Sequence, residues 1–393
     1  MKIKGVIDHS IFFIMILKAI RVFMFGLLSI ILPNFLLYSG FSSLDAGLII
    51  TASIISSSMM NILTGLFARG KNAYNLMMIF SIFIIISGMS LFSFNRYLII
   101  FGSIIGMISA TGTETGPFGS LEQALIPKFV KGEYTTFYYS IYNIIGYLFS
   151  VLGNYSVYFT GNPSAFRFYF IIYSLSGLFF IIIYTIIKNN LYYDADGKWN
   201  KTVNEETKRI ALYTGILFSI DSFAGGFIIQ SILALWLKHF FDVDMNLQGI
   251  ILGTGGLITV ISLYITPGIA KRFGLLNTMV LSHILSNIFL ILITFLNSLY
   301  SVILLLYLRQ AFSQMDVPTR QSFFMKIIDK NDRTYFSSFT NMPRGFAQAG
   351  SPWIAGLLIS MNLLAAPFII SGSLKIVYDL TIFSIFKNYR NIK

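Results

Sequence analysis

Long apolar runs separated by short polar breaks limit how this chain can fold more than any other feature. A bilayer core about 30 Å thick needs a helix of about 20 mainly apolar residues. The sequence contains twelve such segments, at about residues 11–37, 44–66, 73–94, 98–126, 136–160, 166–187, 210–238, 247–270, 276–297, 299–325, 335–359 and 362–386. Only 11% of its 393 residues are charged, against about 25% in soluble domains. We therefore predict an all-α integral membrane protein with twelve transmembrane helices.

The distribution of lysine and arginine predicts the orientation of these helices. If alternate breaks lie on opposite sides of the bilayer, one side carries 19 of the 28 basic residues, including those near both termini and those at 188–209, and the other side carries 3. An excess of lysine and arginine marks the cytoplasmic side. We expect both termini in the cytoplasm and the protein in the cell membrane. The net charge of +12 is then a topology signal, and no nucleic-acid partner is predicted.

The two halves of the chain resemble each other at an offset near 200 residues. The string GLLSIILPNFLLYSGF at 26–41 aligns with GFIIQSILALWLKHFF at 226–241, and further matches follow in register. Self-similarity over several helices indicates a duplication. We predict an N-terminal six-helix bundle at 1–188, a hydrophilic cytoplasmic linker at 189–209 and a C-terminal six-helix bundle at 210–393.

The sequence lacks the residues that several kinds of catalytic or metal-binding site need. The chain has no cysteine and three histidines far apart in sequence, which disfavours a metal site. The glycines around TGTETGPFG at 111–119 are followed by no Gly-Lys-Ser/Thr, so an ATPase loop is rejected, and an irregular helix is expected there instead. We predict no enzyme activity and no cofactor.

Twelve helices in two parallel repeats, with cytoplasmic termini and a cytoplasmic central loop, resemble the major facilitator superfamily of secondary transporters. A loop motif of this family reads Gly, three residues, Asp, a basic residue, any residue, Gly. Two strings of this sequence are similar to it, TGLFARGKN at 64–72 and TPGIAKRFGLLN at 266–277. Gly65, Arg69, Arg272 and Gly274 are the matching positions. Both copies lack the acid, so a conformational lock that uses it must differ here.

Four charged residues lie deep inside predicted spans: Arg21, Glu114, Asp221 and Arg309. An ionisable group at mid-bilayer costs at least about 2.5–3.5 kcal/mol and tends to face a cavity or a partner. They fall on helices one, four, seven and ten, which line the central cavity in the family that the chain resembles. We expect them to form the substrate and proton path, with Gln230 as a further contact and Glu114 or Asp221 carrying the proton. Permanent structural ion pairs are the alternative.

A second set of charges lies nearer the cytoplasmic ends of the helices. Asp316 and Arg320 are four residues apart and can pair on one helix face, and Pro318 between them is expected to kink the helix. With Glu122 and Arg344 they form a predicted cytoplasmic gate; static packing against loops is the alternative. Lys375 and Asp379, also four apart, are expected to neutralise each other.

The resulting function hypothesis is a secondary active transporter that moves a small molecule by alternating access, coupled to protons or another ion. Either export of drugs and amphipathic compounds or uptake of a metabolite fits. The alternative is a sensor or lipid-moving protein on the same fold. The expected partners are the substrate, the coupling ion and the lipid bilayer, and we expect a monomer.

Overall fold

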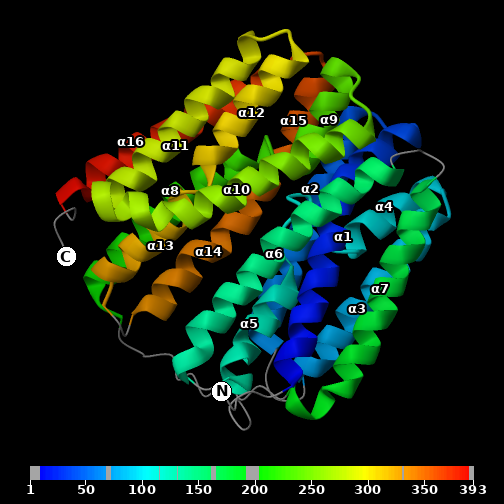
Figure 1. The fold of residues 1–393 in the computed structure, drawn as a ribbon, viewed down its shortest axis with the longest axis horizontal. Helices are drawn as coiled ribbons and strands as arrows, with labels where there is room; N and C mark the ends of the chain where they lie inside the picture. The colour runs from blue at the N-terminus through cyan, green and yellow to red at the C-terminus, as the bar shows by residue number, and fades with distance from the viewer. Residues whose placement is uncertain are drawn as a thin grey trace. The chain divides into compact units, whose positions relative to one another are not determined.

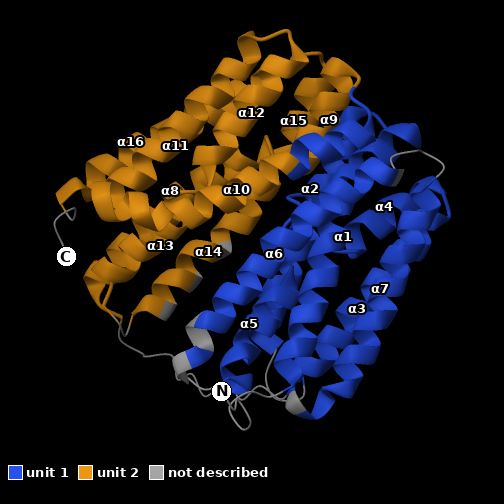
Figure 2. Ribbon diagram, in the orientation of Figure 1, with its two compact units in different colours: residues 1–197, 243–253 blue, residues 198–242, 254–393 orange. Residues whose placement is uncertain are grey.

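The computed structural model describes residues 9–67, 72–114, 116–130, 132–160, 165–191, 203–329 and 332–388. The chain divides into two compact units, one of residues 1–197 and 243–253 and one of residues 198–242 and 254–393, here called unit 1 and unit 2 (Figure 2). The first turns of helix α10 thus belong to unit 1. Part of the predicted linker, residues 192–202, lies outside the described residues.

Unit 1 is built from helices that cover the first six predicted spans (Figure 1). They are α1 (Ser10–Tyr38), α2 (Ser43–Phe67), α3 (Asn72–Phe92), α4 (Arg96–Ile105), α5 (Pro117–Phe129), α6 (Gly132–Thr160) and α7 (Phe166–Ile186), followed by the short 3-10 helix η2 (Lys188–Asn190). Helix α1 packs along α6, and α3 packs along α7.

Unit 2 covers the other six predicted spans. Its helices are α8 (Glu205–Gly226), α9 (Gln230–Phe241), most of α10 (Met245–Phe273), α11 (Leu275–Leu292), the 3-10 helix η3 (Ile293–Phe295), α12 (Leu299–Ser313), α13 (Asp316–Ile327), α14 (Arg333–Ala349), α15 (Pro352–Ser360) and α16 (Ala366–Phe386). Helix α8 packs against α14 and α16, and α11 packs against α16.

Each of the twelve predicted spans coincides with one helix or with two consecutive helices, which confirms the fold class. Eight described segments are long and apolar enough to cross a membrane by length and composition. The other four predicted spans are α4–α5, the tyrosine-rich α6, α12–α13 and α14–α15. Under the predicted duplication, helices four and five correspond to ten and eleven, so the same spans of each half are broken or more polar.

Proline and glycine explain two of the breaks. Between α4 and α5, Met107 and Gly112 have positive φ values of 51° and 72°, and Pro117 starts α5. Helix α12 ends at Ser313, and Pro318 lies in the first turn of α13. Because Pro318 has no N–H for the carbonyl of Gln314, four residues earlier, α12 and α13 cannot form one helix with an unbroken hydrogen-bond ladder. Both irregularities were predicted from the sequence.

Close contact between α1 and α6 depends on glycine. A Cβ atom at Gly26 would collide with the carbonyl of Ser150, and one at Gly153 with the carbonyl of Phe23. Small residues let helix backbones approach closely where lipid removes the hydrophobic driving force for association. These two glycines therefore set the spacing between α1 and α6.

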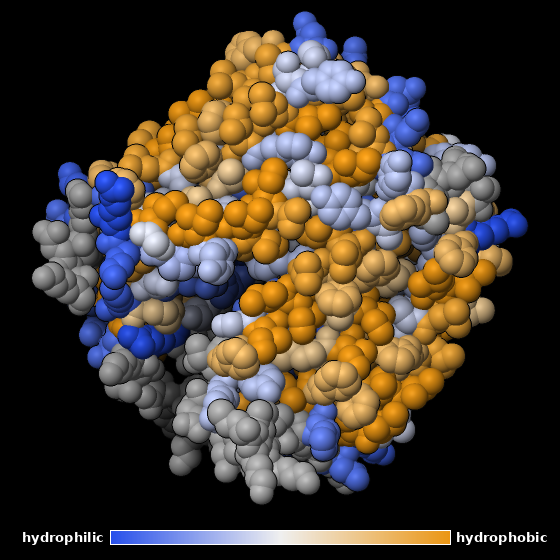
Figure 3. Space-filling model, viewed as in Figure 1, coloured by the Kyte–Doolittle hydropathy of each residue, from blue (hydrophilic) through white to orange (hydrophobic). Residues whose placement is uncertain are grey.

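Apolar side chains also cover the outside of the helices. Met89, Leu281, Leu304 and Val377, all within predicted spans, are 65%, 63%, 60% and 58% exposed. The face seen in Figure 3 is covered largely by apolar residues, and most of the strongly hydrophilic ones lie at its margin. Together with the apolar helix lengths, this makes the chain a multi-pass membrane protein.

Candidate functional site

Arg21 on α1 lies at the centre of a buried ion network in unit 1 and is 1% exposed. Its Nη1 and Nη2 donate to the two oxygens of Glu122 on α5 at 2.8 and 2.6 Å. Glu122 is 0% exposed. Two parallel N–H···O bonds between a guanidinium and a carboxylate are the strongest form of this pair. Arg21 and Glu122 therefore join α1 to α5.

Two tyrosines complete the coordination of Glu122. The hydroxyl of Tyr142 on α6 donates to its Oε2 at 2.8 Å, and that of Tyr184 on α7 donates to its Oε1 at 2.7 Å. The ring of Phe118 stacks on Tyr184 and lies 4.9 Å from the guanidinium carbon of Arg21. Each carboxylate oxygen of Glu122 thus accepts two hydrogen bonds, and four helices meet at this side chain.

Glu114 lies in the irregular segment between α4 and α5 and contacts the same arginine. Its Oε2 accepts from Arg21 Nε at 2.9 Å and from Lys18 Nζ at 3.3 Å. Its Oε1 is buried and has no hydrogen-bond partner among the described residues, and neither has the buried Oγ of Ser57 on α2. Both atoms lie 3.8 Å from the position of a Cβ built on Gly116. Of the two carboxylate oxygens, Oε2 therefore accepts hydrogen bonds from two cations, whereas Oε1 accepts none from the described residues.

These six residues, Lys18, Arg21, Glu114, Glu122, Tyr142 and Tyr184, are called the Arg21 cluster below. Its two cations and two carboxylates balance. A buried charge needs a partner and hydrogen bonds for its remaining polar atoms, and the cluster supplies both except at Glu114 Oε1. The sequence assigned Arg21 to the path and Glu122 to the gate, whereas the structure joins them in one network.

Asp221 on α8 is the centre of a corresponding network in unit 2. Its Oδ1 accepts from Lys375 Nζ on α16 at 2.7 Å, and its Oδ2 accepts from Arg320 Nη1 on α13 at 3.3 Å. Arg320 also pairs with Asp316 at 3.1 Å, which confirms the predicted contact four residues apart. Both oxygens of Asp221 are therefore engaged by cations.

His283 on α11 extends this network toward α16. Its Nδ1 lies 2.9 and 3.0 Å from the two oxygens of Asp379, and its Nε2 lies 3.8 Å from Oδ1 of Asp221. The predicted Lys375–Asp379 pair is wrong, because Lys375 binds Asp221 and Asp379 binds His283. Asp221, His283, Asp316, Arg320, Lys375, Asp379 and Tyr378, whose hydroxyl accepts from Arg320 at 3.4 Å, are called the Asp221 cluster.

The two clusters have opposite polarity at related positions. Arg21 on the first span binds an acid on the fourth, whereas Asp221 on the seventh binds a cation on the tenth. Residues 21 and 221 correspond at the offset of 200. Each central arginine also lies against a phenylalanine ring, with Arg21 at 4.9 Å from Phe118 and Arg320 at 4.9 Å from Phe218.

Arg309 and Arg344 form no ion pair with either cluster among the described residues. Arg309 on α12 donates to the side chain of its neighbour Gln310 at 3.3 Å, and its buried Nε has no partner within the described part of the chain. Arg344 on α14 donates to Ser222 Oγ at 3.1 Å and to Asn341 Oδ1 at 3.4 Å. Gln230 is the first residue of α9.

The loop motif is described in part. Arg69 lies outside the described residues, and Gly65 has open space around it. Arg272 is near the end of α10, and Gly274 joins α10 to α11 with a φ of 86°. Glycine adopts this left-handed conformation without strain. The match at Gly274 therefore reflects a real backbone requirement.

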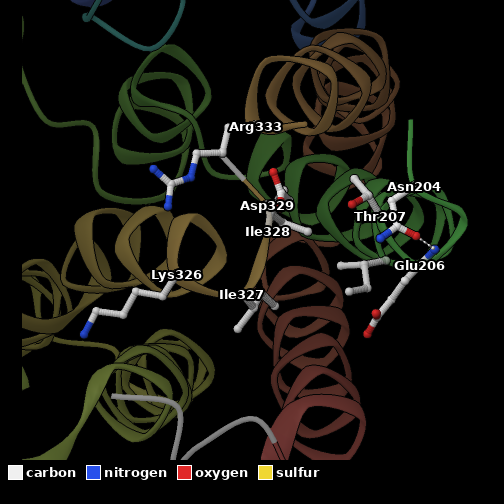
Figure 4. Close-up of a pocket in the computed structure, with 9 residues that line it drawn as sticks. Asn204, Glu206, Thr207, Lys326, Ile327, Ile328, Asp329 and Arg333 are labelled. Atoms are coloured by element: carbon white, nitrogen blue, oxygen red, sulfur yellow. Dashed lines mark hydrogen bonds between the residues drawn. The ribbon is translucent and has the colours of Figure 1, made fainter. Parts of the chain in front are cut away.

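A cavity of about 650 Å³ lies at one end of unit 2. Figure 4 shows Asn204, Thr207 and Glu206 on one side of it, and the side chains of Lys326 and Arg333 extending toward the other side. Thr207 is fourteen residues before Asp221 on α8, or about 21 Å along the helix. On α13, however, Lys326 in the cavity wall is only six residues beyond Arg320, about 9 Å along the helix.

Sequence reasoning missed the tyrosines and the histidine that bind the buried carboxylates of the two clusters. Tyr142 and Tyr184 are two of 22 tyrosines, and nothing in their local pattern separates them from lipid-facing ones. His283 in an apolar run was a usable signal, since a buried histidine needs a polar partner. The described part of the chain contains no group of three acidic or histidine side chains able to hold a metal ion.

Comparison with known proteins agrees with the fold. No family model matches the sequence. An uncharacterised membrane protein of Saccharomyces cerevisiae is 26% identical over 343 residues, 75% of each chain. Because that relative is uncharacterised, the similarity agrees with a membrane protein but points to no activity.

Solved transporter structures superpose on nearly the whole chain. The nucleoside transporter NupG has a TM-score of 0.72 at 14% identity and covers 97% of this chain and 100% of its own. The POT-family transporter PepTSo has a TM-score of 0.77 at 11% identity, covering 98% and 99%. A D-xylose–proton symporter has a TM-score of 0.74 at 12% identity, covering 95% and 97%. The chain has the fold of these transporters, which confirms the resemblance at the level of the fold.

Proposed function

We propose that this chain, folded as the major-facilitator transporters are, is a secondary active transporter that moves a small molecule by alternating access and couples this movement to protons at Glu114. The two moving bodies are the predicted bundles, 1–188 and 210–393, joined by the linker at 189–209. The bias of lysine and arginine supports a cell-membrane protein with both termini in the cytoplasm.

The ion clusters support movement of each unit as a rigid body. The Arg21 cluster ties α1, α5, α6 and α7 together through one carboxylate, and the Asp221 cluster ties α8, α11, α13 and α16 together. Buried, mutually hydrogen-bonded charges are costly to separate. A bundle cross-linked in this way rocks as a whole instead of deforming, as alternating access requires.

The observation that carries proton coupling is the unpartnered Oε1 of Glu114. A proton can occupy this oxygen while Oε2 keeps its contacts with Lys18 and Arg21. Protonation of Asp221 would instead displace Lys375 or Arg320. Glu114 is thus favoured over Asp221 as the carrier, and its place in an irregular segment allows the local backbone to respond.

The test measures proton movement in liposomes containing the purified protein and a pH-sensitive dye. A ligand is first selected by a thermal-shift screen and then added outside. The wild type should change the internal pH when the ligand is added, and Glu114→Gln should abolish that change while retaining ligand binding. The matched control, Asp45→Asn at the exposed start of α2, should behave as the wild type.

Unchanged proton movement in Glu114→Gln would eliminate Glu114 as the carrier. A ligand that crosses the membrane equally well with and without a pH gradient in the wild type would eliminate proton coupling altogether.

A further inference from the structure

The cations within the predicted spans fall into two groups. Lys18, Arg21, Arg320 and Lys375 each lie within 3.3 Å of a carboxylate oxygen. Arg344 and Arg309 have no carboxylate within 4 Å among the described residues. Away from their ends, the predicted spans of unit 2 carry three carboxylates, Asp221, Asp316 and Asp379, and the four cations Arg309, Arg320, Arg344 and Lys375. Arg320 and Lys375 pair with these acids, and Arg309 and Arg344 are the two cations without a carboxylate contact among the described residues.

Arg344 lies at a depth where an unpaired charge needs an explanation. It is eleven residues into α14, which begins at Arg333, so it is about 17 Å along the helix and close to the middle of a core about 30 Å thick. A guanidinium at that depth faces water, a cavity or a counter-ion. No carboxylate of the described residues lies in contact with it.

Its guanidinium is nevertheless fixed in position. Nε donates to Ser222 Oγ on α8 at 3.1 Å, Nη1 donates to Asn341 Oδ1 at 3.4 Å, and the ring of Phe218 lies 5.6 Å from its carbon. These contacts use two of the five N–H groups of the side chain. One N–H on Nη1 and both on Nη2 have no acceptor within the described ranges, so an N–H fork remains available.

Neighbouring acids are already committed. Asp221 and Asp316 bind Arg320, whose guanidinium contacts the same Phe218 ring at 4.9 Å. The face of α14 around Arg344 is polar, because Asn341 and Gln348 lie three residues before and four after it. Arg344 is thus a positioned cation, on a polar helix face, without an acid of its own.

We propose that Arg344 binds the oxyanion group of the transported molecule, and that the substrate is a small organic anion with a carboxylate or phosphate group. This inference rests on the proposed transport function and names its substrate class. Oxyanions accept two parallel hydrogen bonds from an arginine fork, and lysine, a compact point charge, does not reproduce this geometry.

The test measures binding to the full-length purified protein at low ionic strength, by the shift in thermal unfolding. The probes are benzoate and phenyl phosphate, with neutral benzamide and cationic benzamidine as controls of similar shape. One or both anions should stabilise the wild type saturably, and the two controls should not; the better anion decides between carboxylate and phosphate.

Three variants locate the site. Arg344→Gln should abolish the shift, and Arg344→Lys should weaken binding by about tenfold through loss of the bidentate contact. Arg96→Gln, which removes an exposed guanidinium at the start of α4, should leave it intact. Arg344→Lys keeps the charge, so it reports on the site even if Arg344→Gln folds poorly. No stabilisation by either anion, or full retention in Arg344→Gln, would overturn the proposal.

These results are separable from those of the proposed function. Anion binding that requires Arg344, in a protein that moves no solute across liposomes, would reject transport and keep the site. Transport of a neutral or cationic solute without anion binding would reject the site and keep transport.

Discussion

Replacing Glu122 with glutamine removes the acid on which four helices converge. Glu122 accepts two hydrogen bonds from Arg21, at 2.8 and 2.6 Å, and one each from Tyr142 and Tyr184, at 2.8 and 2.7 Å. Glutamine keeps one carbonyl oxygen but places an NH₂ group against these donors. Removing one partner of a buried ion pair costs about 3–5 kcal/mol. Because Arg21 retains Glu114, we expect a loss near the lower end, about 3 kcal/mol.

The assay is unfolding by SDS in mixed micelles, followed by circular dichroism. Tryptophan fluorescence does not report on unit 1, because the three tryptophans are at 199, 236 and 353. Glu205→Gln is the control, since Glu205 forms an exposed pair with Lys208 and its loss should have no measurable effect.

A double-mutant cycle with Arg21→Met separates the ion pair from general damage. If Arg21 and Glu122 are paired as described, the double variant should be more stable than the sum of the single losses predicts, by about 1–3 kcal/mol. Strict additivity of the two losses would refute the pairing.

Two further predictions concern helix contacts and the second cluster. Gly153→Ala should destabilise the protein, because its Cβ would collide with the carbonyl of Phe23 on α1, whereas Gly65→Ala, with nothing nearby, should not; equal thermal stabilities of the two variants would contradict this packing. His283→Leu should lower the free energy of unfolding by about 2–3 kcal/mol by leaving Asp379 without its hydrogen bond. Asp379→Asn in the same background should recover part of that loss, and an unfolding titration that shows no recovery would reject the contact.

Local rules predicted the helices well because membrane spanning is itself a local constraint. A span needs about 20 apolar residues whatever its neighbours are, so all twelve segments could be located from the sequence. The contact between Asp316 and Arg320 follows from the geometry of one helix. The breaks near Gly112 and Pro318 follow from glycine and proline in the same way.

Partners that are distant in sequence could not be identified. Arg21 and Glu122 are 101 residues apart, and Asp221 and Lys375 are 154 apart. The local rule failed for Lys375 and Asp379, because burial made better partners available on other helices. The repeat offset did align Arg21 with Asp221. It does not show that Arg21 binds an acid in one half whereas Asp221 binds cations in the other.

Counterflow is the most direct test of the transport proposal. Liposomes containing the protein are loaded with a ligand that stabilises it, diluted into labelled ligand, and sampled over time without any pH gradient. Alternating access predicts a transient accumulation of label above its equilibrium level, and Glu114→Gln should retain it because exchange needs no net proton movement. A ligand that binds the wild type but never enters the liposomes would contradict the account.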